Sequence, residues 1–309
     1  MPALARSAMQ LTPRDMAIVE MVYRFGGCTV EHIHERMWPE NTALSSCYRR
    51  IARLVAAKYL AATRLPSLSG QGSGRTLLTI GPSARPLIAK LLAVPLAALP
   101  RAADVATPLF LAHHFAVCDF RVALELATAH DLAVSLVDWT LESELKRLPT
   151  RVTDTYALQG KSRTRTITLI PDGAFTLAHH GSAERAYFEQ DMATMSPKRL
   201  ALKLRGYLIQ QQELPVPVFF VTLTQSRAAQ IVDLAAREAH QLKADPTVFF
   251  VTTKDQIRKD TILHAPIWHQ PTVQTLVAII RGSAPDDTAS PPRFNSTRSA
   301  SPVVRSGHR

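Results

Sequence analysis

Cysteine is scarce in this chain of 309 residues. Its three cysteines, Cys28, Cys47 and Cys118, lie far apart, and no two of them have the short spacing of a thiol motif. A disulfide framework or a cysteine-rich zinc site needs more thiols at closer spacing. The sequence therefore predicts three free thiols buried in the protein interior.

Long hydrophobic runs are missing as well. No run approaches the roughly 20 apolar residues that a membrane-spanning helix needs. The first residues also lack the basic segment, apolar stretch and small-residue cleavage site of a secretion signal. Hydrophobic residues still make up 46% of the chain, which is enough for a buried core. We expect a cytoplasmic globular protein with no membrane partner.

Acidic residues are outnumbered by basic ones, and the chain has a net charge of +11. The excess is concentrated in residues 1–110, which contain 13 Lys and Arg against 6 Asp and Glu. A surplus of this kind favours a polyanionic partner. A basic membrane-binding segment would gather its charges on one amphipathic helix or beside a lipid anchor, and the sequence has neither.

The first 80 residues have the element order of a winged helix. The predicted helices begin at Thr12, at Thr29 and at Asn41 or Thr42, and the predicted strands cover residues 60–64 and 75–80 around a Gly- and Ser-rich loop at 67–74. In a winged helix the third helix lies in the major groove of DNA and the wing contacts the backbone. Double-stranded DNA is therefore the predicted partner of this region.

Basic side chains gather on the predicted third helix and wing. The candidates for contacts with phosphates or guanine edges are Arg49, Arg50, Arg53, Lys58, Arg64 and Arg75. The alternative is a three-helix unit that mediates protein contacts and whose arginines are merely solvated.

The second half alternates helices with strands. The predicted helices cover residues 112–130, 196–212, 225–242 and 275–281, and the predicted strands cover residues 133–137, 167–170, 174–177, 186–188, 216–223 and 247–252. Residues 150–166 are polar and basic and are expected to form a loop or an irregular hairpin. This order predicts an α/β domain within an α+β chain, with an antiparallel meander at one end of the sheet and parallel strands at the other. It is also the element order of the restriction-endonuclease-like fold.

Composition places the domain boundaries. We expect a winged-helix domain at 1–92, a Pro- and Ala-rich linker at 93–110, the α/β domain at 111–282, and a disordered basic tail at 283–309. His113 and His114 begin the first helix of the α/β domain. Adjacent residues on a helix point in different directions, so we expect capping or packing roles for both histidines.

Acidic residues follow two of the predicted strands. Asp172 comes directly after the first strand of the meander, and Glu189 and Asp191 come at the end of the last one. Strands in a hairpin lie about 5 Å apart, so Asp172 and Glu189 are expected to lie side by side. Two carboxylates at that distance repel each other unless a cation lies between them or one holds a proton. The pair is therefore a candidate Mg²⁺ site. The alternative is that Asp172 opens a turn and the other two acids are solvated charges.

The hairpin resembles the catalytic hairpin of the PD-(D/E)xK nucleases, except that Asp191 stands where those enzymes have a lysine. More broadly, residues 11–255 resemble the replication-relaxation proteins of plasmids and mobile elements. The motifs that carry this resemblance are LTPRD at 11–15, Leu54 with Leu60, His113 before an amphipathic helix, Trp139 with Glu142, PDG at 171–173, FEQD at 188–191, and Lys203 with Tyr207. The resemblance implies a DNA-binding protein that acts in plasmid replication or in the relaxation of DNA. Replication or mobilisation proteins and a second copy of the chain are open as further partners.

A hydrolytic site at the acidic cluster would use five residues. Asp172 and Glu189 would hold Mg²⁺, Asp191 would add a third carboxylate, and Glu142 would reach in from the first strand. Lys203, on the following helix, would offset charge on the attacked phosphate. Three hypotheses stay open: a DNA-binding plasmid factor with an inactive nuclease-like domain, an active metal-dependent endonuclease or nickase, and a winged-helix transcriptional regulator.

Overall fold

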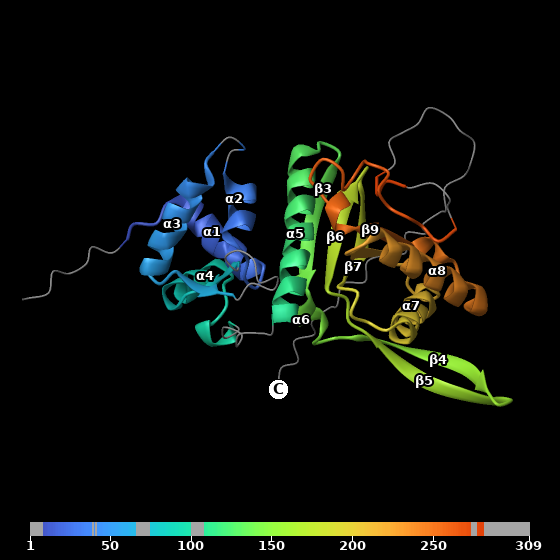
Figure 1. Ribbon diagram of the computed structural model, residues 1–309. Helices are drawn as coiled ribbons and strands as arrows, with labels where there is room; N and C mark the ends of the chain where they lie inside the picture. The colour runs from blue at the N-terminus through green and yellow to red at the C-terminus, as the bar shows by residue number, and fades with distance from the viewer. Residues whose placement is uncertain are drawn as a thin grey trace, which may run out of the picture.

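Three helices followed by two strands open the computed structural model, which describes residues 9–38, 40, 42–65, 75–99, 108–272 and 277–280. The helices are α1 (Pro13–Arg24), α2 (Val30–Met37) and α3 (Leu44–Ala56), and the antiparallel strands are β1 (Leu60–Arg64) and β2 (Thr76–Ile80) (Figure 1). Helix α4 (Arg85–Leu91) follows, between the 3₁₀ turns η1 (Pro82–Ala84) and η2 (Leu96–Ala98). The predicted loop at 67–74 and tail at 283–309 lie outside the described residues.

The start of α1 is fixed by hydrogen bonds that its sequence encodes. Thr12 Oγ1 accepts a hydrogen bond from Asp15 N at 3.3 Å, and the Asp15 carboxylate accepts one from Thr12 N at 2.7 Å. This capping box satisfies two N–H groups that have no partner inside the helix. The fully buried Asp15 carboxylate also accepts two hydrogen bonds from the guanidinium of Arg50. The ion pair therefore joins α1 to α3.

Arg50→Ala is expected to destabilise the protein by about 2 kcal/mol. Removing one partner of a buried ion pair costs roughly 3–5 kcal/mol, and the 19% exposure of the Arg50 side chain reduces that cost. Urea denaturation followed by circular dichroism measures the free energy of unfolding. The exposed neighbour Arg49 is the matched control, and Arg49→Ala should change stability by less than about 0.5 kcal/mol. Equal effects of the two substitutions would contradict a structural role for Arg50.

Helices α1–α4 and strands β1 and β2 form the N-terminal unit. Helix α5 (Pro108–His130) lies between this unit and the sheet of the second half (Figure 1). On one side, Cys118 and Val122 belong to the core formed with α1–α4. On the other side, Phe120 and Leu124 belong to the core beneath the sheet. The helix begins at Pro108, inside the segment expected to be a linker. The two halves of the molecule therefore share one helix.

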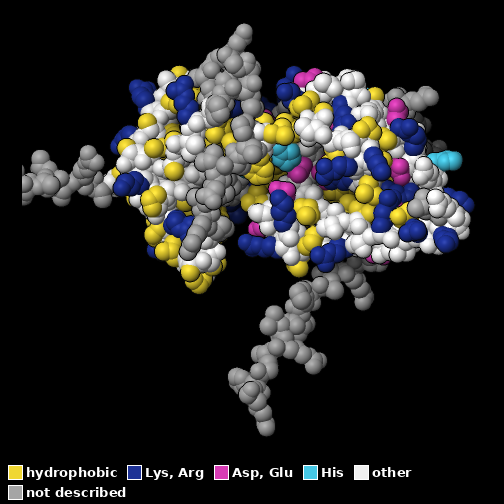
Figure 2. Space-filling model, turned by 60° about the horizontal axis from the view of Figure 1, so that its bottom comes forward, with side chains coloured by type: hydrophobic (Ala, Val, Ile, Leu, Met, Phe, Trp, Pro, Cys, Tyr) yellow, Lys and Arg dark blue, Asp and Glu magenta, His cyan; other side chains and the backbone are white. Residues whose placement is uncertain are grey.

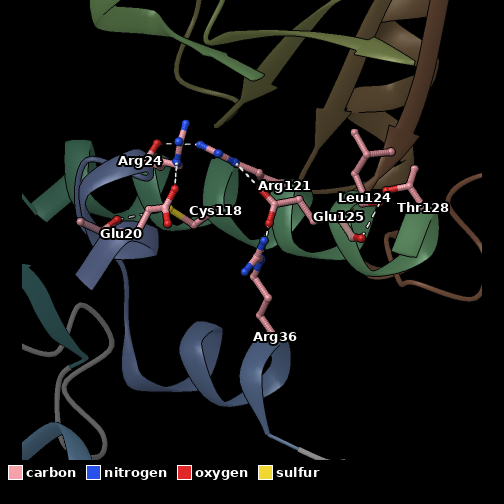
Figure 3. Close-up of polar contacts among 9 residues, drawn as sticks. Glu20, Arg24, Arg36, Cys118, Arg121, Leu124, Glu125 and Thr128 are labelled. Carbon is pink, nitrogen blue, oxygen red and sulfur yellow. Dashed lines mark hydrogen bonds and ion pairs between the residues drawn. The ribbon is translucent and has the colours of Figure 1, made fainter. Parts of the chain in front are cut away.

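Polar contacts fasten α5 to α1 and α2 (Figure 3). Arg121 donates hydrogen bonds to Glu125 at 2.8 Å and to the main-chain oxygen of Arg24 at 2.7 Å. Glu125 also forms an ion pair with Arg36 of α2. Nearby, the Cys118 thiol faces the loop that follows α1. All three cysteines are free and buried, as predicted.

A mixed five-stranded sheet forms the second half of the molecule, in the order β3-β6-β7-β8-β9. Its strands are β3 (Val134–Leu141), β6 (Gly173–His179), β7 (Ser182–Asp191), β8 (Val218–Thr222) and β9 (Phe249–Thr253). The pairs β3–β6 and β6–β7 are antiparallel, whereas β7–β8 and β8–β9 are parallel. The predicted α+β class, with antiparallel strands at one end and parallel strands at the other, is confirmed.

Helices cover both faces of this sheet. Helices α7 (Pro197–Gln211) and α8 (Gln225–Leu242) lie on one face and α5 lies on the other (Figure 1). Side chains alternate between the faces along a strand, so Tyr187 of β7 packs with α7 and α8 while Phe188 packs on the α5 side. The ring centroids of Phe188 and Phe120 are 4.0 Å apart. This stacking anchors the sheet on the shared helix.

A long antiparallel ribbon replaces the loop or irregular hairpin expected at 150–166. It consists of β4 (Thr150–Leu158) and β5 (Lys161–Leu169), which pair along their whole length. The prediction that residues 167–170 form the first strand of the meander was wrong, because β6 pairs with β3 instead. Ile167 and Leu169 pack against α7 at Gly206, where a Cβ atom would lie 2.8 Å from Ile167 Cγ2. Contact with a helix, not with the sheet, therefore explains this apolar run.

The last described segments return across the sheet edge after the 3₁₀ turns η3 (Pro246–Val248) and η4 (Lys254–Gln256). The helix expected at 275–281 does not form in its described part, because Val277 pairs with the buried Trp268 in an isolated bridge. Within the part of the chain that the structure describes, no helix has both the length and the apolar character needed to cross a membrane.

Candidate functional site

An open cavity of about 170 Å³ lies where α5, the start of β6, the end of β7 and α7 meet. Five ionisable side chains from these elements line it: His113, Asp172, Glu189, Asp191 and Lys203. Four of these residues, all except His113, were predicted as site residues from the sequence. The structure brings them together.

The β6–β7 hairpin places Asp172 beside Glu189, as the sequence predicts. Asp172 N donates a hydrogen bond to Phe188 O at 3.0 Å, and Gln190 N donates one to Asp172 Oδ2 at 2.8 Å. Gly173 follows because a Cβ atom there would lie 2.7 Å from the Trp139 ring. The PDG sequence thus combines an acid held by the neighbouring strand with a glycine that lets the Trp139 indole approach.

Helix α7 brings a cation to this pair of acids. The Lys203 ammonium donates a hydrogen bond to Glu189 Oε2, and the Tyr207 hydroxyl donates one to Glu189 Oε1. Lys203 and Tyr207 are four residues apart and therefore lie on the same face of the helix. From the other side of the sheet, His113 Nε2 lies 3.0 Å from Asp172 Oδ2. Each carboxylate therefore has a basic partner.

The pKa values follow from this arrangement. Burial raises the pKa of Asp172, but the hydrogen bond from His113 and the charge of Lys203 lower it by more, so the net shift is downward. Burial, assisted by the charge of Asp172, raises the pKa of Glu189 to about 7 in spite of Lys203. Burial lowers the pKa of Lys203, but the charges of Glu189 and Asp172 raise it overall. Near neutral pH, Asp172 is ionised and Lys203 is protonated.

His113→Gln is expected to lower the melting temperature by about 2–4 °C, mainly between pH 4 and 6.5. Burial lowers the pKa of His113, but Asp172 raises it overall. The stability gained by His113 is therefore full below its unfolded pKa of about 6.5 and is lost as pH rises through the folded value. The gain from Asp172, whose pKa is lowered, is lost as pH falls through its folded value. Melting curves from pH 4 to 9 test this window.

The exposed His240 of α8 supplies the control, because His240→Gln should leave the pH profile unchanged. A constant gap between wild type and His113→Gln across the whole pH range would contradict a charged His113–Asp172 pair.

Asp191 has different partners from the other two acids. Its carboxylate accepts hydrogen bonds from Arg227 Nε at 2.8 Å and Nη2 at 3.0 Å, and from Thr222 Oγ1 at 2.8 Å. Asp191 and Arg227 are both buried. These contacts join β7 to β8 and α8, so Asp191 is held in a structural ion pair at the edge of the cavity.

Glu142 begins α6 (Glu142–Leu145) and lies beside the site without lining the cavity. It forms an ion pair with Lys146 at 2.7 Å, and its charge contributes to the raised pKa of His113. Among the described residues, no three His, Cys, Asp or Glu side chains are grouped as ligands for a metal ion. Asp172 and Glu189 are the carboxylates of the cavity that could hold Mg²⁺, since this ion keeps several waters and is often held by one or two carboxylates together with substrate phosphates.

The predicted DNA-contacting residues divide into two groups. Five of them are exposed at the surface of the N-terminal unit: Arg49, Arg53, Lys58, Arg64 and Arg75. Arg50 is engaged by Asp15 instead, which makes it a poor candidate for a phosphate contact. Arg75 also lies over the Phe115 ring of α5, 5.6 Å from its centroid.

Sequence reasoning missed two partners at the site. His113 was expected to have a capping or packing role, but it reaches Asp172; His114 points elsewhere and contacts Gly27 O at 2.8 Å. Adjacent helix residues point in different directions, and this could have indicated that one of the two histidines faces the acidic cluster. No sequence signal identified Arg227 as the partner of Asp191, because α8 reaches Asp191 only after β8 has paired in parallel with β7.

These features define an α+β protein. It has a helical, basic N-terminal unit and an Asp–Glu–Lys cluster at the end of a mixed sheet. The chain belongs to the replication-relaxation family, whose sequence model matches residues 19–212. The matched region begins within α1 and contains α2, α3, α5 and all the residues of the Asp172–Glu189–Lys203 cluster. Membership supports a role in the replication or relaxation of plasmid or mobile-element DNA. No curated protein and no solved structure shows significant similarity to the chain.

Proposed function

We propose that this protein binds duplex DNA in the cytoplasm through a winged helix formed by α1–α3 and β1–β2, and that it nicks one strand at the Asp172–Glu189 site with the help of Mg²⁺. The observation that carries the proposal is the position of Lys203. Its ammonium meets Glu189 directly beside Asp172, in an open cavity. This restores the acid, acid and lysine set of the PD-(D/E)xK nucleases, with the lysine supplied by α7 in place of position 191.

The residues of the cluster divide the chemistry among them. Mg²⁺ held by Asp172 and Glu189 would activate a water molecule and stabilise the leaving oxygen of the phosphodiester. Lys203 would offset the negative charge that develops on the attacked phosphate. Tyr207 orients the Glu189 carboxylate through its hydroxyl. His113 holds Asp172 in place and keeps it ionised.

The proposed DNA contacts rest on the shape of α3. Cys47, Ile51 and Leu54 face the core of the N-terminal unit, whereas Arg49 and Arg53 are exposed and four residues apart on one helix face. Arg64 and Arg75 lie together where β1 and β2 leave the unit, since Leu65 N bonds to Arg75 O at 3.0 Å. A helix face and a neighbouring hairpin end, both basic, are the two surfaces with which a winged helix holds DNA.

Replacing both Arg49 and Arg53 with alanine is expected to weaken binding to duplex DNA and to make it less dependent on salt. Each lost phosphate contact lowers the slope of log K against log salt concentration by about 0.9, so the double variant should lose about 1.8. Fluorescence anisotropy with a 30-base-pair duplex in a KCl series measures both quantities. The matched control is Arg237→Ala with Lys243→Ala, at two exposed positions of α8 and its cap. A helix variant with the slope of the control would contradict the proposed docking surface.

Incubation with negatively supercoiled plasmid tests the second half of the proposal. The wild-type protein should convert the plasmid to open circles when Mg²⁺ is present and leave it intact in EDTA. Binding without nicking would make the acidic cluster an inactive relic and leave a DNA-binding replication factor. Footprinting separates either outcome from a transcriptional regulator, since protection should fall at a replication or mobilisation origin and not at a promoter.

A further inference from the structure

The β4–β5 ribbon has no packing role along most of its length. Among the side chains that the structure describes, those at its base are covered: Val152, Ile167 and Leu169 belong to the core that includes α7, and Asp154 accepts a hydrogen bond from Arg205 of α7 at 2.9 Å. Beyond this base the ribbon projects past the rest of the molecule (Figure 1). Nine residues in each strand give a length of roughly 30 Å. An isolated two-stranded ribbon is only marginally stable in water, so this extension calls for a functional explanation.

The charge of the ribbon is strongly one-sided. It carries four basic residues, Arg151, Lys161, Arg163 and Arg165, against the single acid Asp154. Asp154 is buried and already paired with both Arg165 and Arg205. Arg151, Lys161 and Arg163 are exposed. Lys and Arg side chains are numerous over the second half of the molecule on the face that Figure 2 shows.

The pairing register sorts the remaining residues by face. One face carries Arg151 at the base of the ribbon, opposite Thr168, and otherwise small exposed side chains, most of them hydroxyl-bearing: Thr153, Thr155, Ala157, Ser162, Thr164 and Thr166. The opposite face carries Lys161 and Arg163 near the tip, beside Tyr156. Ammonium, guanidinium and hydroxyl groups are the side chains that bond to phosphate oxygens in DNA complexes. A two-stranded ribbon also fits within the major groove.

The base of the ribbon adjoins the candidate site at both ends. β4 begins at Thr150, a few residues after Glu142, and β5 ends at Leu169, three residues before Asp172. The ribbon is thus an insertion between two strands of the sheet, at the point where those strands carry the acidic residues. We propose that the β4–β5 ribbon is a second duplex-DNA-binding element, separate from the winged helix, which holds the DNA backbone beside Asp172 and Glu189. The inference rests on the proposed DNA-binding function.

A ribbon variant of the full-length chain tests this assignment. In R151T/K161T/R163T, threonine removes three charges and keeps the β-branched shape that suits this ribbon. The slope of log K against log salt should fall by about 2.7, and affinity at 0.15 M salt should fall about a hundredfold, because each phosphate contact contributes about fivefold at that concentration. The matched control is R237A/K243A/K254A, which removes three exposed cations from other parts of the second half. Its slope and affinity should equal those of the wild type.

Two further variants keep the outcome unambiguous. R151K/K161R/R163K retains the charges and should bind like the wild type, which ties the loss of binding to charge; an unchanged circular dichroism spectrum of R151T/K161T/R163T shows that this variant keeps its fold. R49A/R53A removes the proposed winged-helix contacts. Its decrease in the salt-dependence slope should add to that of the ribbon variant, because the substituted residues are far apart in the chain and have no common contact partner.

Each result points one way. A ribbon variant with the wild-type slope, together with a weakened R49A/R53A variant, overturns the ribbon inference and leaves the proposed function standing. Wild-type protein that fails to bind the duplex at low salt overturns both. A ribbon variant that changes the sedimentation coefficient but not the salt slope shows a contact between copies of the chain, and it also overturns the inference.

Discussion

Asp172→Asn is expected to abolish Mg²⁺-dependent nicking of supercoiled plasmid and to remove the stabilisation that Mg²⁺ gives to the folded protein. The carboxylate is ionised near neutral pH, because His113 and Lys203 lower its pKa. An amide supplies no charge to hold the cation. Loss of such an electrostatic contribution costs about a hundredfold to a thousandfold in rate.

The metal response gives a second readout that needs no substrate. A cation at 100 times its dissociation constant stabilises the folded state by about 2.7 kcal/mol, which corresponds to a rise of roughly 5–10 °C in the melting temperature. Wild type should show this rise and Asp172→Asn should not. Lys203→Met should lose nicking but keep the metal response, because it removes a cation and leaves both carboxylates. A melting curve of the wild type that neither Mg²⁺ nor Mn²⁺ changes would contradict the metal site.

The structure also changes what the substitution should do without metal. From the sequence, repulsion between adjacent acids suggests that Asp172→Asn is neutral or slightly stabilising in metal-free buffer. In the structure each acid already has a basic partner, and Asp172 accepts hydrogen bonds from His113 and Gln190 N. The substitution should therefore destabilise the metal-free protein by about 1–2 kcal/mol.

Asp191→Asn is expected to destabilise the fold by about 3–5 kcal/mol, because it leaves the guanidinium of Arg227 buried without a counter-charge. Both side chains are less than 10% exposed, so solvent compensates little. The melting temperature should fall by roughly 10 °C or more. Thermal unfolding followed by circular dichroism measures the change.

An exposed ion pair of the same sheet supplies a control. Asp138 and Arg185 are both more than 40% exposed and 4.0 Å apart, so Asp138→Asn should cost at most about 1 kcal/mol. Nicking by Asp191→Asn, measured well below its melting temperature, should stay within a few-fold of wild type. A loss of nicking as large as that of Asp172→Asn in a fully folded sample would instead restore Asp191 to the catalytic group predicted from the sequence.

Local signals in the sequence predicted the elements well. Thr12 and Pro13 mark the start of α1 because capping and a fixed φ act within one turn. The continuous apolar runs of β8 and β9 mark strands that are buried on both faces of the sheet. Asp172 and Glu189 came together as expected, since a hairpin sets the register of its own two strands. The helix cap and the hairpin register both depend on residues that are close in the chain.

Contacts between residues far apart in the chain could not be predicted from such local signals. Ile167 and Leu169 have the apolar spacing of a sheet strand, and nothing nearby shows that their partner is Gly206 on α7. Arg50 looks like an exposed helix arginine until Asp15, 35 positions earlier, is seen to be fully buried. Lys203 was identified only as a cation that helix α7 can carry to the site, and its hydrogen bond to Glu189 depends on how that helix packs.

The shared helix α5 limits where recombination between related genes can give a well-packed protein. A recombination joint in the segment between Leu99 and Pro108 would look harmless, since it falls between the two sequence regions. It would nevertheless combine a foreign N-terminal unit with Cys118, Val122 and Arg121, side chains that fit the core and main chain of this one. The recombinant protein would have a poorly packed core. The N-terminal unit and the part that carries Asp172 and Glu189 are therefore expected to be inherited together.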